Sequence, residues 1–240
     1  MHTKTVEPGI ELIKIPSGSH LIGTDARGVP ANEIPSISVT IEYEVWLMAR
    51  PMTRHEWSLT GLADPSRHGG SEIMAGLHPV DSVTIPDIEQ ALEILNADMD
   101  GGAWRLPTEA EWEIACRAGT GTSWWFGDDV GDLGRASWYS ANAGVSTCVV
   151  GQKEPNPWGF HDMLGNVREW CSDVWLPSHD GRPRDGSPAE GDDPRRPARG
   201  GAWICESLSC RASSRVALDP ESRSDAVGLR LAWSPGMILS

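Results

Sequence analysis

The 240-residue sequence predicts one domain in which short helices and strands alternate with long irregular segments. Capping patterns mark the starts of a few short helices, and alternating apolar residues mark strands near the N-terminus. Pro and Gly recur at short intervals through residues 135–200, and no internal repeat or clean linker divides the chain. The twelve Trp predict a densely packed core, in which indole N–H groups need hydrogen-bond partners.

The first 50 residues predict a sheet. Residues 10–15 are a strand ended by a Pro-Ser-Gly turn, and residues 20–22 are a second, short strand. Residues 24–35 are polar and predict a loop. Residues 37–43 then place alternate apolar side chains on one face, as in a half-buried strand. Residues 45–48 are expected to continue the same sheet.

Two helices are predicted in the next segment. Thr53 and Glu56 form a capping box that opens a helix ending near Thr60. Residues 61–76 predict a loop. Asp87 is expected to cap a second helix, which Gly101 and Gly102 end, and its apolar positions are Ile88, Ala91, Leu92 and Leu95.

Residues 104–119 carry the clearest helix signal in the chain. Thr108 and Glu111 form a capping box, and the neighbouring acidic residues Glu109 and Glu113 place negative charge near the positive end of the helix. An apolar face follows, and Gly119 is expected to end the helix; the face consists of Trp112, Ala115 and Cys116. The segment predicts a short helix with one buried face.

The C-terminal half predicts little regular structure. Residues 177–198 are rich in Gly, Pro and charged residues and predict a mobile surface loop. Strands are expected at residues 198–204 and 227–232.

Charge and cysteine content narrow the function classes. A net charge of −14 argues against nucleic-acid binding, because phosphate recognition needs a basic face. No run approaches the roughly 18 apolar residues of a membrane helix, and the first residues lack the apolar core of a secretion signal. Five Cys, an odd number, predict reduced thiols in a cytoplasmic protein without a membrane partner.

Six segments then coincide in order: PMTRHEW, HPVDSVT, WRLPTEAEWEIACRAG, PNPWGFHDMLGNVREWCSDVW, RGGAW and VGLRLA. From about residue 10 to residue 233 the chain resembles the formylglycine-generating-enzyme, or sulfatase-modifying-factor, family. The resemblance implies a single α+β domain of irregular, loop-rich C-type-lectin-like fold. It leaves three kinds of function open: copper-dependent oxidases, sulfoxide-synthase domains and non-catalytic binders, some of them hypervariable proteins of diversity-generating retroelements.

The oxidase alternative rests on two cysteines. In the resembling oxidases two thiolates hold Cu(I), a soft ion that sulfur ligands select. Counted from RGG at residues 199–201, Cys205 and Cys210 match that pair. Counted back from Arg215, the pattern CRASSR resembles non-oxidase members, which would place Cys210 about three positions out of register. Ala202, Arg168, Ala226 and Val227 also stand where the oxidases have other residues.

The resemblance also implies a calcium site. The positions that match the family's calcium-binding segment are Asp162, Gly165, Val167 and Glu169, which offer two carboxylates and two carbonyls to a hard cation. The alternative is that Asn166 and Glu169 tie down a loop by hydrogen bonds. The seven His lack metal-ligand spacing, which argues against the iron-dependent branch.

The leading hypothesis is a ligand- or peptide-binding domain without oxidase chemistry, with a variable-loop binder of the diversity-generating-retroelement type as one form. In binding members the loops of this region form the recognition face. Here the expected face lies within residues 203–227, with Trp124, Trp125 and Arg168 beside it, and it includes Trp203, Ile204, Glu206, Ser207, Leu208, Ser209, Ser214, Val216 and Leu218. The expected partner is an unidentified protein, peptide or small molecule. A third hypothesis is a scaffold or sensor subunit of a larger assembly.

Overall fold

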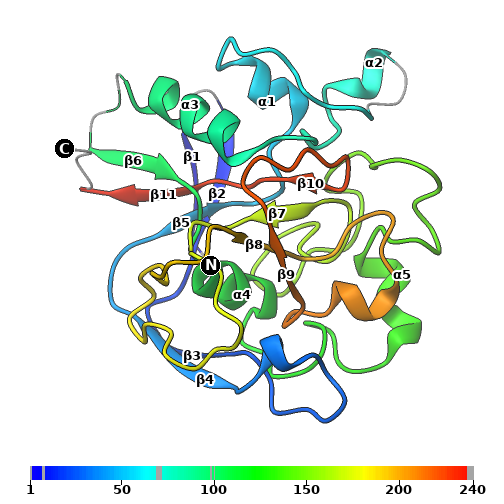
Figure 1. Cartoon of the computed structure of the whole chain (residues 1–240). Helices are drawn as coiled ribbons and strands as arrows, with labels where there is room; N and C mark the ends of the chain where they lie inside the picture. Colours follow the sequence, from blue (N-terminus) through cyan, green and yellow to red (C-terminus); the bar gives the residue numbers. More distant parts are fainter. Residues whose placement is uncertain (1, 7–8, 69–71, 98, 100, 237–240) are drawn as a thin grey trace.

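The computed structural model describes residues 2–6, 9–68, 72–97, 99 and 101–236. Three sheets form its framework (Figure 1). The largest is antiparallel in the order β1-β2-β5-β11-β6; its strands are Thr3–Val6, Ile10–Lys14, Trp46–Met48, Ala232–Pro235 and Gly102–Arg105.

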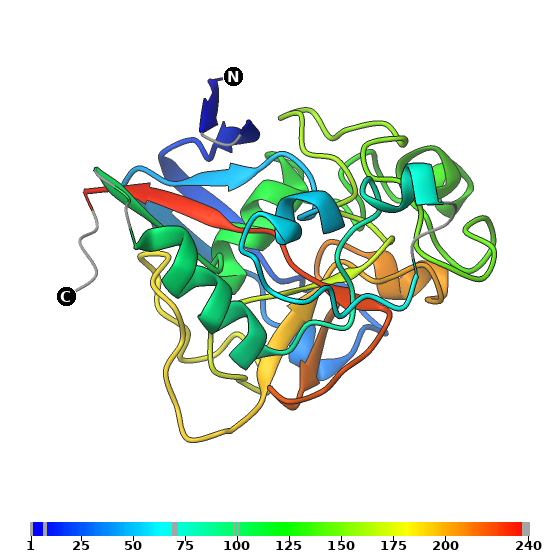
Figure 2. The same cartoon turned by 90° about the horizontal axis from the view of Figure 1, so that it is seen from above.

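A second sheet has the order β10-β7-β8-β9; its strands are Val227–Gly228, Arg168–Trp170, Arg196–Arg199 and Arg215–Leu218. Strand β10 is parallel to β7, and the other pairs are antiparallel. The third sheet is the hairpin-like pair β3 (Gly18–Ile22) and β4 (Ile37–Ile41). Most connections between the sheets are irregular loops, as Figures 1 and 2 show.

The helices are short. The α-helices are α1 (Arg54–Ser58), α2 (Glu72–Ala75), α3 (Ile85–Asn96), α4 (Glu109–Arg117) and α5 (Leu133–Ala136), and the 3₁₀ turns are η1 (Ala31–Glu33), η2 (Val130–Asp132) and η3 (Ser207–Cys210). Helix α3 packs against β6 of the large sheet, whereas α4 lies between β3 and β8 (Figure 1). No described helix is both long and apolar enough to cross a bilayer.

Most predicted strands are confirmed, but their sheet membership differs from the prediction. Strands β2, β3 and β4 lie where alternation placed them, and Ile37, Val39 and Ile41 are buried. The single sheet expected for the first 50 residues is divided: residues 45–48 form β5, which joins the sheet of β2 as expected, whereas β3 and β4 pair with each other in a separate sheet. The expected strand at 227–232 is split into β10 and β11, which join different sheets.

The capping boxes at Thr53 and Thr108 are confirmed, and the cap of α3 needs correction. Thr84, not Asp87, is the N-cap: Thr84 Oγ1 accepts the Asp87 amide, and Asp87 accepts the Thr84 amide at 2.9 Å. Helix α4 ends at Arg117 with Ala118 as its C-cap, so Gly119, which adopts φ 89°, takes the C′ position that the sequence predicts.

Helix α4 is buried on every side, which contradicts the prediction of one buried face. Its three glutamates pair with arginines: Glu111 pairs with Arg105 of the preceding strand β6, and Glu109 and Glu113 pair with arginines from distant segments. Glu109 accepts from Arg215 Nε at 2.6 Å and also pairs with Arg182, while Arg199 bridges Glu109 and Glu113. Buried charges are tolerated when they are paired in this way, so α4 is the polar centre of the molecule as well as an apolar anchor.

The prediction that residues 177–198 form a mobile loop also needs correction. Arg182, which it carries, is buried and donates to Asp173 Oδ1 at 2.7 Å and to Glu109. The Ala189 amide binds Asp173 at 3.0 Å, and residues 196–198 belong to β8. We call residues 177–195 the strap, because buried hydrogen bonds hold it against α4.

His179 of the strap gives the fold a predicted pH dependence. Burial lowers the pKa of His179 to about 4, and the charged groups around it act in both directions: Glu113 and Glu109 raise the pKa, whereas Arg215 and Arg182 lower it. An unfolded His titrates near pH 6.5. Between pH 6.5 and 4 the unfolded chain therefore binds more protons, so stability is lost as the pH falls, by roughly 3 kcal/mol in all.

Chemical denaturation between pH 8 and 4 measures this loss, with His179→Gln as the comparison. The variant is expected to show a flatter profile from pH 6.5 to 4. Below pH 4.5 both proteins should lose stability: burial opposes ionisation of Glu113, but Arg199 and Arg117 hold its pKa at about 2. Equal slopes for the two proteins between pH 6.5 and 4 would refute the role of His179.

Candidate functional site

The segment that follows β8 leaves the core through two glycines with positive φ, Gly200 and Gly201. A Cβ on Gly201 would lie 2.6 Å from Cys210 Sγ, so this turn and η3 are packed in direct contact. The Trp203 amide donates to Asn166 O at 2.8 Å, and the Ala212 amide donates to Ser123 O at 2.8 Å. Backbone bonds therefore fix both ends of the loop.

Two arginines attach the loop to buried carboxylates. Arg211 forms a bidentate pair with Glu33, at 2.7 and 2.8 Å, and Ser213 Oγ donates to the same carboxylate at 2.6 Å. Arg215 pairs with Glu109. The RGG and CRASSR motifs thus serve to anchor a surface loop on the buried charges of η1 and α4.

The loop presents apolar side chains to solvent between these anchors. Ile204 is 58% exposed and Leu208 is 62% exposed, and Glu206 between them is also exposed. Ser207 and Ser209 are partly exposed. We call these five residues the 204–209 patch. Two large apolar side chains thus reach solvent within five residues of one anchored loop.

Other predicted members of the face lie elsewhere. Val216 and Leu218 project from β9 and pack against the apolar cluster that contains Trp57 and Trp170, so they do not join the patch. Trp124 is buried, whereas Trp125 and Arg168 are partly exposed, as is Ser214. Trp203 is nearly buried: its indole donates to Asp225 O at 3.0 Å and its ring meets His68 edge-on at 5.2 Å. The Trp203 side chain is therefore held against Asp225 and His68 and is not part of the exposed surface.

Cys205 and Cys210 belong to the same apolar cluster as α4, and both are free thiols. Cys210 has no exposed surface. Burial raises the pKa of the Cys210 thiol to about 12, and the nearby Cys205 adds to the rise. The two cysteines therefore share one cluster, and Cys210 lies in the core environment of a small apolar residue.

The four residues predicted to bind calcium fit that ion only in part. Glu169 accepts from Arg230 at 2.7 and 2.9 Å and from the Trp112 indole at 2.6 Å, so its carboxylate already has partners. Gly165 and Val167 precede Glu169 in the same segment and would contribute only their backbone carbonyls. Asp162 is the member with a buried oxygen, Oδ1, that has no hydrogen-bond partner, and burial raises its pKa.

Asn166 ties this segment down, as the alternative interpretation expected. Its side chain exchanges two hydrogen bonds of 3.0 Å with the backbone of Cys148. The described residues contain no cluster of three or more His, Cys, Asp or Glu side chains arranged to hold a metal. Calcium binding thus stays a prediction and depends on Asp162.

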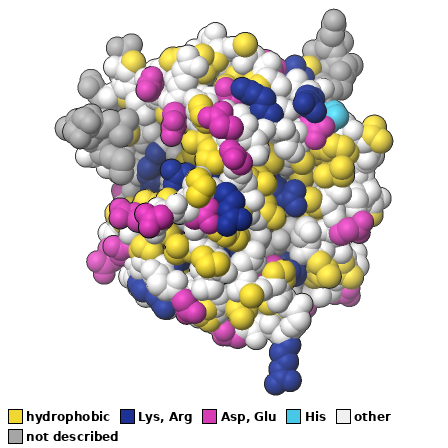
Figure 3. Space-filling view, viewed as in Figure 1, with side chains coloured by type: hydrophobic (Ala, Val, Ile, Leu, Met, Phe, Trp, Pro, Cys, Tyr) yellow, Lys and Arg dark blue, Asp and Glu magenta, His cyan; other side chains and the backbone are white. Residues whose placement is uncertain are grey.

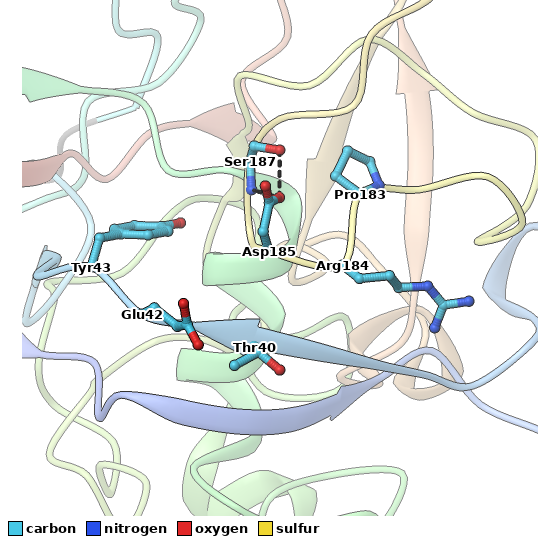
Figure 4. A pocket seen from close by; sticks show the side chains of 7 residues that line it. All are labelled: Thr40, Glu42, Tyr43, Pro183, Arg184, Asp185 and Ser187. Carbon is cyan, nitrogen blue, oxygen red and sulfur yellow. Dashed lines mark hydrogen bonds between the residues drawn. The ribbon is translucent and has the colours of Figure 1, made fainter.

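No sequence motif indicates the cleft that lies between the end of β4 and the strap, because its two walls are about 140 residues apart in the chain. Tyr43, the last residue of the predicted strand 37–43, belongs to the wall formed by residues 40–43. Figure 4 shows the cleft with its lining side chains. It shares no residue with the 204–209 patch.

Comparisons with known proteins cover the whole chain. The model of the sulfatase-modifying factor enzyme 1-like domain matches residues 1–235. Among solved structures, Treponema denticola variable protein 1 superposes with a TM-score of 0.87 at 25% identity, covering 98% of this chain and 99% of that one. PvdO from Pseudomonas aeruginosa superposes with a TM-score of 0.84 at 28% identity, covering 97% and 98%.

Curated relatives match over a shorter stretch. The formylglycine-generating enzyme of Thermomonospora curvata is 33% identical over 153 residues, which are 55% of this chain and 50% of the enzyme. That of Streptomyces coelicolor is 34% identical over 144 residues, 53% of this chain and 46% of the enzyme. The match thus spans about half the length of each of these relatives.

Proposed function

The chain belongs to the sulfatase-modifying-factor (formylglycine-generating-enzyme-like) family, and within that family we propose that it is a ligand- or peptide-binding domain without oxidase chemistry. The observation that carries this proposal is the 204–209 patch. Its apolar side chains are exposed on a loop whose backbone and arginines are anchored, so a ligand would meet a preformed surface. A preformed surface avoids the entropic cost of ordering a loop on binding.

The structural relatives support this proposal. The similarity to Treponema denticola variable protein 1 extends over 98% of this chain. We therefore propose that the 204–209 patch occupies the place of a variable binding loop of the diversity-generating-retroelement type. A fold of this kind can hold many loop sequences, because the anchors lie beneath the loop and not within it.

A copper-dependent oxidase is the second candidate, and the position of the cysteines favours it. Cys205 and Cys210 keep the spacing from RGG that the oxidases have, and they are neighbours in the fold. Relatives named formylglycine-generating enzyme match about half of the chain. We rank it second because Cys210 is fully buried and a buried thiol does not readily become a thiolate.

Two further proposals concern a structural calcium ion and the cellular compartment. Asp162 Oδ1 would be the carboxylate oxygen that a structural calcium ion contacts, with the carbonyls of Gly165 and Val167 beside it. The five free cysteines favour a reducing compartment such as the cytoplasm.

A selection from a random twelve-residue peptide library tests the binding proposal. Selected peptides are expected to bind the wild-type chain, and Ile204→Ser and Leu208→Ser should each weaken the Kd at least tenfold by removing apolar contact area. Tenfold corresponds to about 1.4 kcal/mol. The matched control is Leu21→Ser on β3, because Leu21 is 59% exposed but lies outside the patch.

Thermal denaturation of the three variants should show small, similar changes, since all three side chains are exposed. Peptides whose affinity falls equally in the Leu21→Ser variant would contradict a specific patch. Failure to select any peptide that depends on Ile204 or Leu208 would contradict the proposal as a whole.

A further inference from the structure

A cleft of about 830 Å³ lies between the C-terminal end of β4 and the strap (Figure 4). One wall comes from residues 40–43 and the other from residues 183–187; the lining residues are Thr40, Glu42, Tyr43, Pro183, Arg184, Asp185 and Ser187. The cleft is lined from the end of β4 and from the strap, whereas the 204–209 patch belongs to the loop that follows β8, and the two share no residue. A role for this cleft does not depend on the function proposed for the 204–209 patch.

Hydrogen bonds fix both walls of the cleft. The Thr40 amide donates to Arg184 O at 2.8 Å and joins the strap to β4. Tyr43 Oη lies 2.8 Å from Glu111 Oε1 and 3.0 Å from Gly186 O, so it connects α4 to the strap. Arg182 holds the preceding residues of the strap in the core. The cleft is therefore preformed, which favours ligand binding.

A second cavity of about 370 Å³ adjoins the cleft, because Tyr43 and Ser187 line both. Its charged lining residues, Arg105 and Glu111, pair with each other at 2.6 and 2.7 Å. What remains for a ligand is mainly apolar: the Tyr43 ring, Leu106 and Pro188. The two cavities thus offer one charged compartment and one apolar compartment on either side of Tyr43.

The larger cleft, which Glu42 and Asp185 line, carries negative charge. Figure 4 shows Glu42 beside Tyr43, Asp185 beside Ser187 on the strap, and the Arg184 side chain extending away from them. Asp185 Oδ1 accepts from the Ser187 amide at 3.0 Å and from Ser187 Oγ at 2.6 Å, which orients the carboxylate. Within the described part of the chain neither Glu42 nor Asp185 has an ion-pair partner.

We propose that this two-part cleft binds a peptide segment that carries a Lys or Arg side chain close to an apolar side chain. Glu42 and Asp185 would receive the cation, and the cavity lined by Tyr43, Leu106 and Pro188 would receive the apolar group. Side chains at positions i and i+2 of an extended peptide lie on one face, roughly 7 Å apart. That separation suits two compartments that share a tyrosine.

Calorimetric titration with Ac-Arg-Ala-Leu-Ala-NH₂ tests the proposal on the full chain. The peptide is expected to bind at least tenfold more tightly than the peptide in which neutral citrulline replaces Arg. Glu42→Gln and Asp185→Asn should each weaken the arginine peptide about tenfold, because each removes one carboxylate charge at an exposed site. Glu190→Gln, also exposed on the strap but outside the cleft, is the control and should leave binding unchanged.

Ile204→Ser should also leave this titration unchanged, which separates the cleft from the 204–209 patch. Equal binding of the arginine and citrulline peptides would overturn the proposal, as would equal weakening by Glu190→Gln. Spermidine that binds as tightly as the arginine peptide would show that the cleft recognises a cation alone and would overturn the peptide assignment. Absence of any binding to the wild-type chain would overturn it outright.

Discussion

Glu109→Gln is expected to lower the free energy of unfolding by about 3–5 kcal/mol, the cost of removing one partner from a buried ion pair. The Glu109 carboxylate accepts from Arg215 and Arg182 and lies 3.4 Å from Arg199. Burial opposes its ionisation, but these three guanidinium groups hold the pKa of Glu109 well below its usual range. The neutral amide would leave three buried cations with too little negative charge.

Guanidinium denaturation of the variant measures this cost, and Glu154→Gln is the control. Glu154 pairs with Arg135 at the surface, where its side chain is 54% exposed, so its removal should change stability little. A loss below about 1 kcal/mol for Glu109→Gln would mean that the α4 network is not what holds the strap and β9 together.

The start of α4 could be predicted from sequence, but its environment could not. A capping box involves residues three apart, so Thr108 and Glu111 can be recognised locally. Glu109 meets Arg182 and Arg215, which are 73 and 106 residues further along the chain. A local pattern shows neither partner, so the sequence indicates that acidic residues lie near the start of α4 but not that they are buried in the core.

The strap is a second case in which a local sequence pattern does not show distant partners. Its Gly, Pro and charged residues are typical of a mobile loop, and composition does not show that Arg182 is buried on Asp173. The sheets differ from prediction for a related reason. Alternation identifies β4 and the apolar character of residues 45–48, but pairing partners depend on the path of the intervening chain.

The candidate site was predicted in part. The family resemblance placed the binding loop, and the structure shows Ile204, Glu206 and Leu208 exposed there. The local sequence does not show which way β9 turns its side chains. In the structure Val216 and Leu218, which are predicted members of the face, pack against the cluster that contains Trp57 and Trp170. The Tyr43 cleft was missed because no local motif links β4 to the strap.

The choice between binder and oxidase depends on two thiols. Metal binding at Cys205 and Cys210 requires thiolates, and burial holds the pKa of Cys210 at about 12, far above neutral pH. A chain that evolved for surface recognition can keep both cysteines as small core residues.

Cu(I) titration under reducing conditions, against a chromophoric competitor, tests this central claim most directly. Wild type, Cys205→Ser and Cys210→Ser are expected to give the same curve, with no stoichiometric uptake in any of them. One equivalent of Cu(I) taken up by the wild type and lost in both serine variants would contradict the account and establish the copper pair.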